Sequence, residues 1–199
     1  ALFSQANWGL WMGDNISTDY KSINVPARKL TAGWNHFEIE LKYNGGKGVY
    51  ADAPLTAVKN FRFFSKNIEK NVLGEASINR VFSAMISAVC FAAEPGATIT
   101  GDTTDVKPQL ALFADATDIN GWASTTWGSV TTQDVDGQAA IQSSSKFIKS
   151  NIDWDSSAIT FNYTPDTPMD ISEMNYLVFD LYMESESDAE LFSQARWDV

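Results

Sequence analysis

The chain has 199 residues, 44% of them hydrophobic and 13% aromatic, and 25 acidic against 14 basic residues give a formal net charge of -11. This composition excludes a disordered chain, and the acidic balance excludes sequence-independent binding to nucleic acid, which needs a basic surface. The single cysteine, Cys90, and the single histidine, His36, exclude an internal disulfide framework and a metal site built from several cysteines or two histidines.

Short stretches rich in β-branched and aromatic residues recur along the chain. In Asn35–Leu41 the alternation places Phe37 and Ile39 on one face and His36 and Glu38 on the other. The expected strands, in chain order, are Asn35–Leu41, Val58–Ser65, Gln109–Phe113, Ala139–Ser143, Ala158–Tyr163, Tyr176–Met183 and Ala189–Trp197. Many short strands separated by turn residues predict an all-β fold, an antiparallel β-sandwich of the jelly-roll type.

One segment departs from this pattern. Its apolar residues at positions 78, 81, 82, 85, 86 and 89 follow helical spacing, and Ser77 is a suitable N-cap, so we expect a short helix over Ser77–Ala92. Ile78–Phe82 fits a final strand equally well. The apolar stretch Val81–Ala93 is too short to span a bilayer, so no membrane insertion is expected. The small polar residues of Gly96–Lys107 indicate a linker.

A seven-residue sequence occurs twice, close to either end of the chain. Leu2–Trp8 (LFSQANW) and Leu191–Trp197 (LFSQARW) differ at one position, as expected for one period of a tandem repeat with a short overlap. We interpret residues 1–88 as the second half of a β-sandwich, 89–108 as a connector and 109–199 as the first half. The halves would pair within one chain, or exchange between chains to form a homo-oligomer.

Several motifs support this order. They are Leu112–Asp115 with Gly121 and Trp122, Tyr176–Tyr182 (YLVFDLY), Leu191–Trp197, Ala32–Leu41 (AGWNHFEIEL) and Leu55–Phe64. Read from 109–199 into 1–88, the chain resembles the galactose-binding-like jelly-roll carbohydrate-binding modules of secreted glycoside hydrolases, the family-eleven type most closely. The resemblance implies a secreted or cell-surface protein with a polysaccharide or glycan partner. The closing strand motif, Ile78–Val81, lacks the Asp that helps some of these modules hold a structural calcium.

Catalytic motifs are missing from the sequence, which has neither a Gly-rich phosphate loop nor a nucleophile elbow. Carboxylate pairs such as Asp153 and Asp155 fit a solvated surface, so we expect no enzyme and no cofactor. The acidic run Glu184–Asp188 leaves a structural calcium open, because hard oxygen ligands cluster in such runs. Cys90 lies in an apolar run and is expected to be an inert core thiol.

The aromatic residues suggest a different role, since flat rings match the C–H face of a pyranose. Strand alternation places certain polar and aromatic side chains opposite apolar neighbours. The expected carbohydrate-binding residues are Gln5, Trp8, Arg62, Asp180 and Tyr182, gathered on one sheet face. Trp34 is interpreted as a core or edge anchor.

Two functions therefore remain open. The first is a non-catalytic carbohydrate-binding module of a secreted or cell-surface multimodular protein, binding polysaccharide through aromatic and polar residues on a sheet face. The alternative is a structural β-sandwich repeat of an extracellular array or filament, with strand exchange between subunits. An exposed aromatic and polar cluster on one sheet would favour the first.

Overall fold

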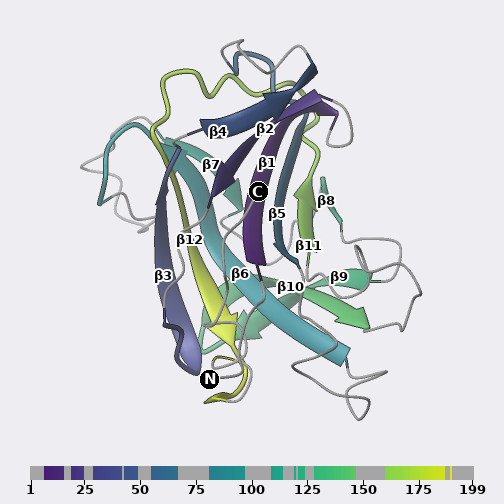
Figure 1. Cartoon of the computed structure of the whole chain (residues 1–199). Coiled ribbons are helices and arrows are strands. Elements are labelled where there is room, and N and C mark those ends of the chain that lie inside the picture. The colour runs from purple at the N-terminus through teal and green to yellow at the C-terminus, as the bar shows by residue number, and fades with distance from the viewer. Residues whose placement is uncertain are drawn as a thin grey trace, which may run out of the picture.

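A computed structural model describes residues 7–15, 19–24, 29–41, 43–48, 55–66, 81–96, 109–113, 119, 121–123, 128–146, 160–186 and 189. These residues form twelve β-strands arranged in two antiparallel sheets packed against each other (Figure 1). The prediction of an all-β sandwich is confirmed. Among the described residues, no helix is long and apolar enough to cross a membrane.

Each sheet takes strands from distant parts of the chain. Sheet A has the order β4 (Tyr43–Lys47), β2 (Asp19–Asn24), β1 (Asn7–Asn15), β5 (Asn60–Lys66), β11 (Thr160–Tyr163) and β8 (Trp122–Ala123). Sheet B has the order β3 (Gly33–Glu40), β12 (Tyr176–Met183), β6 (Val81–Ala92), β10 (Gln138–Lys146) and β9 (Gly128–Val135). A further strand, β7 (Gln109–Phe113), also pairs with β6.

The core lies between the two sheets and is rich in phenylalanine. In sheet B, Phe37 of β3 and Phe179 of β12 are register partners whose rings stack at 4.9 Å. Phe63 of sheet A reaches Phe179 across the sandwich, with ring centroids 4.6 Å apart. All three side chains are at most 2% exposed, so alternating strand positions supply the apolar contact that holds the layers together.

The expected helix over Ser77–Ala92 is wrong, because Val81–Ala92 is strand β6. Ala84, Ile86, Val89 and Phe91 all belong to the core, although the step from 86 to 89 is three residues rather than two. Ala88 has a φ of 51°, and the register with β12 shifts there by one residue. This β-bulge moves the core-facing positions from even to odd numbers. The spacing of three that it creates resembles a helical period.

Strands from residues 1–88 and from 109–199 are interleaved in both sheets. In sheet A, β5 pairs with β11, and in sheet B, β12 lies between β3 and β6. The two segments thus complete each other's sheets in this structure. The expected boundary after residue 88 falls inside β6, which continues through Val89–Ala92 before the turn at residues 93–96.

Candidate functional site

The face of sheet B that points away from the core, here called the outer face of sheet B, carries a row of side chains across five strands. Register partners link Trp34 of β3 to Tyr182 of β12, Tyr182 to Met85 of β6, Met85 to Gln142 of β10, and Gln142 to Thr131 of β9. Residues directly opposite one another in an antiparallel sheet share a face. The row therefore places an aromatic pair and a group of polar side chains on one face, with the buried Met85 between them.

The aromatic end of this row is the pair formed by Trp34 and Tyr182. Their ring centroids are 5.1 Å apart with an interplanar angle of 64°, an edge-to-face contact. Both side chains are half-buried. In an edge-to-face contact each ring restricts the rotation of the other, which favours a fixed orientation of both.

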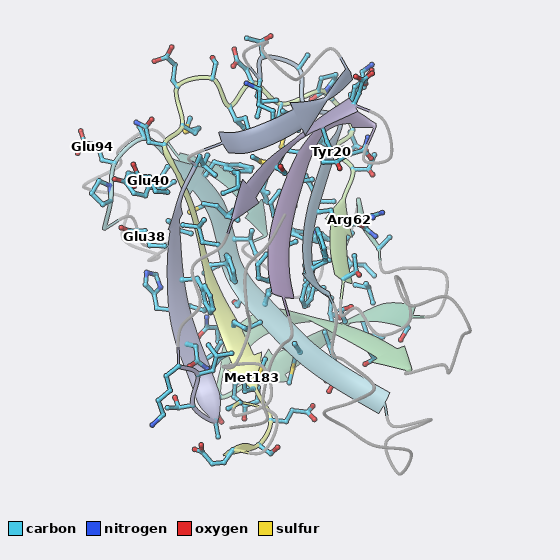
Figure 2. The ribbon with its side chains drawn as sticks, viewed as in Figure 1. Tyr20, Glu38, Glu40, Arg62, Glu94 and Met183 are labelled. Atoms are coloured by element: carbon cyan, nitrogen blue, oxygen red, sulfur yellow. The ribbon has the colours of Figure 1, made fainter. Side chains whose placement is uncertain are left out.

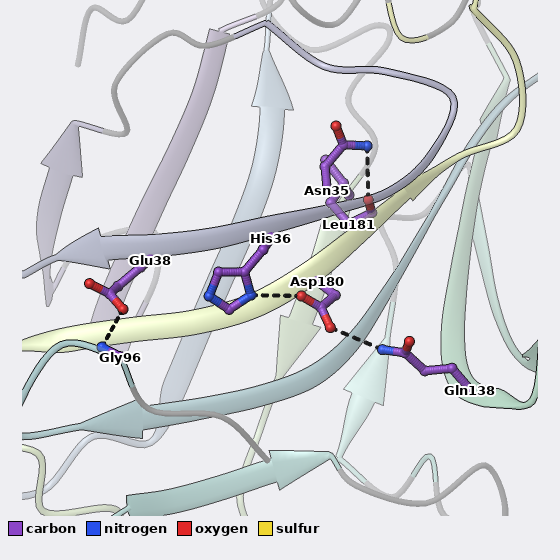
Figure 3. Close-up of polar contacts among 7 residues, drawn as sticks. All are labelled: Asn35, His36, Glu38, Gly96, Gln138, Asp180 and Leu181. Carbon is purple, nitrogen blue, oxygen red and sulfur yellow. Dashed lines mark hydrogen bonds and ion pairs between the residues drawn. The ribbon is translucent and has the colours of Figure 1, made fainter. Parts of the chain in front are cut away.

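Next to the aromatic pair, Asp180 of β12 is held from two sides (Figure 3). The His36 ring lies on one side, with Nδ1 2.8 Å from Asp180 Oδ1, and Gln138 on β10 donates from Nε2 to Asp180 Oδ2 at 3.0 Å. The Asp180 side chain is 25% exposed and that of His36 is 51% exposed. Both carboxylate oxygens are thus oriented by neighbours from two other strands, which fixes the group while leaving part of it accessible.

The far end of the row is a band of neutral polar groups ending in a carboxylate. The Gln142 side-chain oxygen accepts hydrogen bonds from Gln133 Nε2 at 3.3 Å and from Thr131 Oγ1 at 3.5 Å. Gln142 Nε2 in turn donates to Glu184 Oε1 at 3.3 Å. Amide and hydroxyl groups on such a band offer the donors and acceptors that sugar hydroxyls need.

One part of the same outer face is shielded from solvent. Cys90, Ala92 and Val178 are at most 2% exposed and form a small cluster separate from the core, with Tyr176 packed against it. Burial raises the pKa of the Cys90 thiol to about 11, so the thiol stays protonated and unreactive at neutral pH.

The turn at residues 93–96 connects this buried part of the face to the edge strand β3. Gly96 N donates to Glu38 Oε2 at 2.7 Å, and Asn175 Nδ2 donates to Ala93 O at 2.8 Å. Glu38, Glu40 and Glu94 gather on this side of the molecule in Figure 2. Carboxylates thus border the buried part of the face, whereas the Trp34–Tyr182 pair and Asp180 lie further along β3 and β12.

The structure brings together two of the five predicted binding residues. Asp180 and Tyr182 are neighbours on the outer face of sheet B. Arg62 lies in β5 of sheet A between the core residues Phe61 and Phe63, where its Nε donates to Asn162 Oδ1 at 2.7 Å. Figure 2 shows Arg62 and Glu38 on opposite sides of the sandwich. The expectation that Arg62 would meet Asp180 and Tyr182 is therefore wrong in this structure.

The remaining two predicted residues are not placed at the site. Trp8 belongs to β1 and its backbone pairs with Ser65 of β5 in sheet A, but its side chain lies outside the described part of the structure. Gln5 also lies outside the described residues. Strand alternation indicates which residues share a face of one strand, whereas it does not say in which sheet that strand lies.

The predicted binding residues did not include several side chains of the site, among them Trp34, His36, Gln138 and Gln142. The signal for the first two was present, because Trp34 and His36 alternate with the apolar residues of β3 just as Asp180 and Tyr182 do in β12. Joining them required the β3–β12 register, which pairs Trp34 with Tyr182 and His36 with Asp180. Gln138 and Gln142 carry no comparable signal.

The acidic run that left a structural calcium open begins beside this face. In the described residues, no group of three or more His, Cys, Asp or Glu side chains is placed to hold a metal ion. Of the acidic run Glu184–Asp188, Glu184 accepts a hydrogen bond from Gln142, and Glu186 Oε1 accepts one from the backbone N–H of Ala32 at 3.3 Å. Residues 187 and 188 lie outside the described part.

Comparison with known proteins gave no protein-family model, curated protein or solved structure that matches the chain. The structure itself defines an antiparallel β-sandwich whose sheet B presents an aromatic and polar outer face.

Proposed function

We propose that this chain is a non-catalytic carbohydrate-binding module of a secreted or cell-surface protein, and that it binds polysaccharide on the outer face of sheet B. The observation that carries the proposal is the half-exposed Trp34–Tyr182 pair beside an Asp180 carboxylate oriented by His36 and Gln138. An aromatic ring covers the apolar face of a sugar, while a fixed carboxylate accepts hydrogen bonds from its hydroxyl groups.

The electrostatics of this face favour an uncharged glycan over an anionic one. Glu38, Glu40, Asp180 and Glu184 contribute carboxylates. The one lysine or arginine of the sheet B strands is Lys146 at the end of β10, whose side chain lies outside the described part of the structure. The net charge of -11 adds to the repulsion of anions. A polysaccharide rich in uronic acid or sulfate is therefore a poor ligand.

Affinity electrophoresis tests the proposal directly. The wild-type chain is expected to be retarded in a native gel that contains a soluble neutral β-glucan, and not in one that contains polygalacturonate. Tyr182→Ala and Trp34→Ala are each expected to weaken binding at least tenfold, which corresponds to about 1.4 kcal/mol. Binding is expected to weaken because each substitution removes an aromatic ring that stacks on the sugar, while the fold is retained.

A control comes from the outer face of sheet A. Arg62 lies there, half-buried between the core residues Phe61 and Phe63 of the strand, and its Nε donates to Asn162 Oδ1. Arg62→Ala is expected to leave retardation unchanged. If Arg62→Ala removes binding while Tyr182→Ala does not, the glycan binds on sheet A and the proposed site is wrong.

A second function, a structural repeat in an extracellular array, is favoured by the duplicated heptapeptide Leu2–Trp8 and Leu191–Trp197. Such a repeat would contribute spacing and assembly rather than glycan recognition. The same gels separate the two functions: a wild-type chain that folds and is retarded by no neutral or charged polysaccharide would favour the structural repeat.

A further inference from the structure

Strand β9 is an open edge of sheet B. It pairs with β10 on one side, and no described strand pairs with it on the other (Figure 1). The strand has eight residues, and its register with β10 is unbroken from Gly128 to Val135. A long, regular edge strand presents a row of backbone groups to which another strand can add.

The turn that follows β9 determines which backbone groups point outward. Val135 and Gln138 close a two-residue hairpin through Asp136 and Gly137, whose φ values of 56° and 79° identify a type I′ turn. The closing pair of such a hairpin is hydrogen-bonded, and alternate pairs follow it. Residues 129, 131, 133 and 135 therefore bond to β10, whereas Val130, Thr132 and Asp134 direct their N–H and C=O groups to the open edge.

The other described sheet edges are less suited to pairing. β3 carries His36, Glu38 and Glu40 along its length, and charged residues on an edge strand oppose the addition of a further strand. β4 contains two glycines and an irregular register with β2, and β8 has two residues. β7 is uncharged, but it has five residues and an irregular register with β6. Among the described edges, β9 alone is long, regular and nearly free of charge.

The side chains of β9 favour a second copy of this chain as the partner. A chain with a net charge of -11 repels its copies, so contact between copies is expected where carboxylates are few. β9 carries one, Asp134, whose Oδ1 already accepts a hydrogen bond from Gly137 N at 3.0 Å. Val130 is half-buried against the core next to the open edge, so an added strand would bury it further.

We infer that two copies of the chain associate by antiparallel pairing of β9 with β9, which makes sheet B continuous across the dimer. A two-fold axis perpendicular to the sheet at Thr131 keeps the outward N–H and C=O groups in register. Thr131 then faces its own copy, Val130 faces Thr132 and Ser129 faces Gln133, which are neutral pairs that suit a sheet. Asp134 faces Gly128, so no two carboxylates meet. The inference is independent of the proposed function, although it would place two Trp34–Tyr182 pairs on one side of a single sheet.

Sedimentation of the full chain tests the pairing. The wild type is expected to change reversibly from 21.9 kDa to twice that mass as its concentration rises. Thr132→Pro removes an N–H that points outward and leaves the bonds to β10 intact, so this variant is expected to stay monomeric. Thr132→Val keeps the N–H and is expected to dimerise like the wild type. A wild type that is monomeric at every concentration would overturn the inference.

Two further results separate edge pairing from exchange of half-domains. An exchanged dimer would persist in Thr132→Pro and would dissociate only on unfolding, and this outcome also overturns the inference. Amide hydrogen exchange tests the same pairing on the wild type alone, so it does not depend on whether a variant folds. The N–H groups of Val130 and Thr132 are expected to become protected as concentration rises, while those of Thr131 and Gln133 are protected throughout. Concentration-independent exchange at Val130 and Thr132 contradicts the pairing.

Discussion

Strands β3 and β12 carry one aromatic pair on each of their two faces. On the inner face Phe37 and Phe179 stack at 4.9 Å with an interplanar angle of 6°, and each is 2% exposed. On the outer face Trp34 and Tyr182 meet edge to face at 5.1 Å and 64°, and both remain half-buried. The same backbone register, with its period of two, builds both pairs.

What differs is the surroundings of each pair. The inner pair is covered by sheet A, whose Phe63 contacts Phe179 at 4.6 Å, and its burial stabilises the fold. The outer pair has polar neighbours, Asp180 and His36, and part of each ring is open to solvent. Identical strand geometry thus produces a structural contact on one face and an accessible platform on the other, and substitutions should separate the two roles.

The largest effect is expected from Phe179→Ala. Removing this buried ring leaves a cavity between the sheets, and the free energy of unfolding should fall by about 3–5 kcal/mol. Urea denaturation measures the loss. The comparison predicts a clearly smaller loss for Tyr182→Ala, three residues further along β12 and on its outer face. Equal losses for the two variants would remove the distinction between the faces.

Cys90→Ser should produce the next largest loss of stability, because Cys90 lies in the buried part of the outer face. A serine hydroxyl placed among Ala92 and Val178 without a hydrogen-bond partner should cost about 1–3 kcal/mol. Cys90→Ala, which introduces no polar group, is the matched variant and should cost less. In the unsubstituted chain the thiol should react with a disulfide reagent far more slowly when folded than when unfolded. Rapid reaction of the folded chain would show that this part of the face is open.

Trp34→Ala should have a moderate effect on stability. The edge-to-face contact with Tyr182 is worth about 0.5–1.5 kcal/mol, and the half-buried ring loses less apolar contact than the fully buried Phe179 does. Thermal unfolding should therefore shift less than for Phe179→Ala, and Trp34→Phe should restore much of the difference. A loss as large as that of Phe179→Ala would place Trp34 functionally in the core.

The smallest effect is expected at Asp170, an exposed carboxylate in the segment that leads to β12. The hydroxyl of Ser172 donates to it at 2.7 Å and the Ser172 backbone N–H at 3.0 Å, and these bonds hold the pKa of Asp170 below its usual value. A lowered folded-state pKa stabilises the fold above the unfolded value of about 3.9, and this contribution is lost as the pH falls through the folded value.

Asp170→Asn should therefore be slightly less stable than the wild type near neutral pH. The difference should disappear in acid, when the carboxyl is protonated. Urea titrations at several acidic pH values measure this convergence, and a difference that grows as the pH falls would contradict it. Asp180 connects three strands through its hydrogen bonds to His36 and Gln138. The hydrogen bonds of Asp170 come from Ser172, two residues further along the chain, so Asp170 should contribute less to the free energy of unfolding.

Local patterns predicted much of the fold. Tyr176–Met183 is β12 with the expected limits, because aromatic and branched residues alternate there without interruption. β6 was misassigned for a physical reason: a bulge at Ala88 depends on pairing with β12 and β7, and these partners lie far away in the sequence. The apolar spacing around such a bulge is ambiguous when strand partners are unknown.

The candidate site was predictable only in part. Asp180 and Tyr182 follow from alternation within β12, whereas Trp34 and His36 join them only through a register formed with a strand more than a hundred residues away in the chain. Arg62 obeys the same alternation within β5 and still points to the other side of the molecule. Periodicity assigns faces within a strand, and only tertiary pairing assigns strands to a sheet.

The bulge at Ala88 also bears on which length changes β6 can tolerate. Deleting this one residue would restore strict alternation while both faces of the strand stay as they are. Val89 and Phe91 would still lie between the sheets, and Cys90 and Ala92 would still lie on the outer face. A single-codon deletion at the bulge should therefore be tolerated, whereas deleting a residue from a strand that alternates without a bulge, such as β12, would turn part of that strand over.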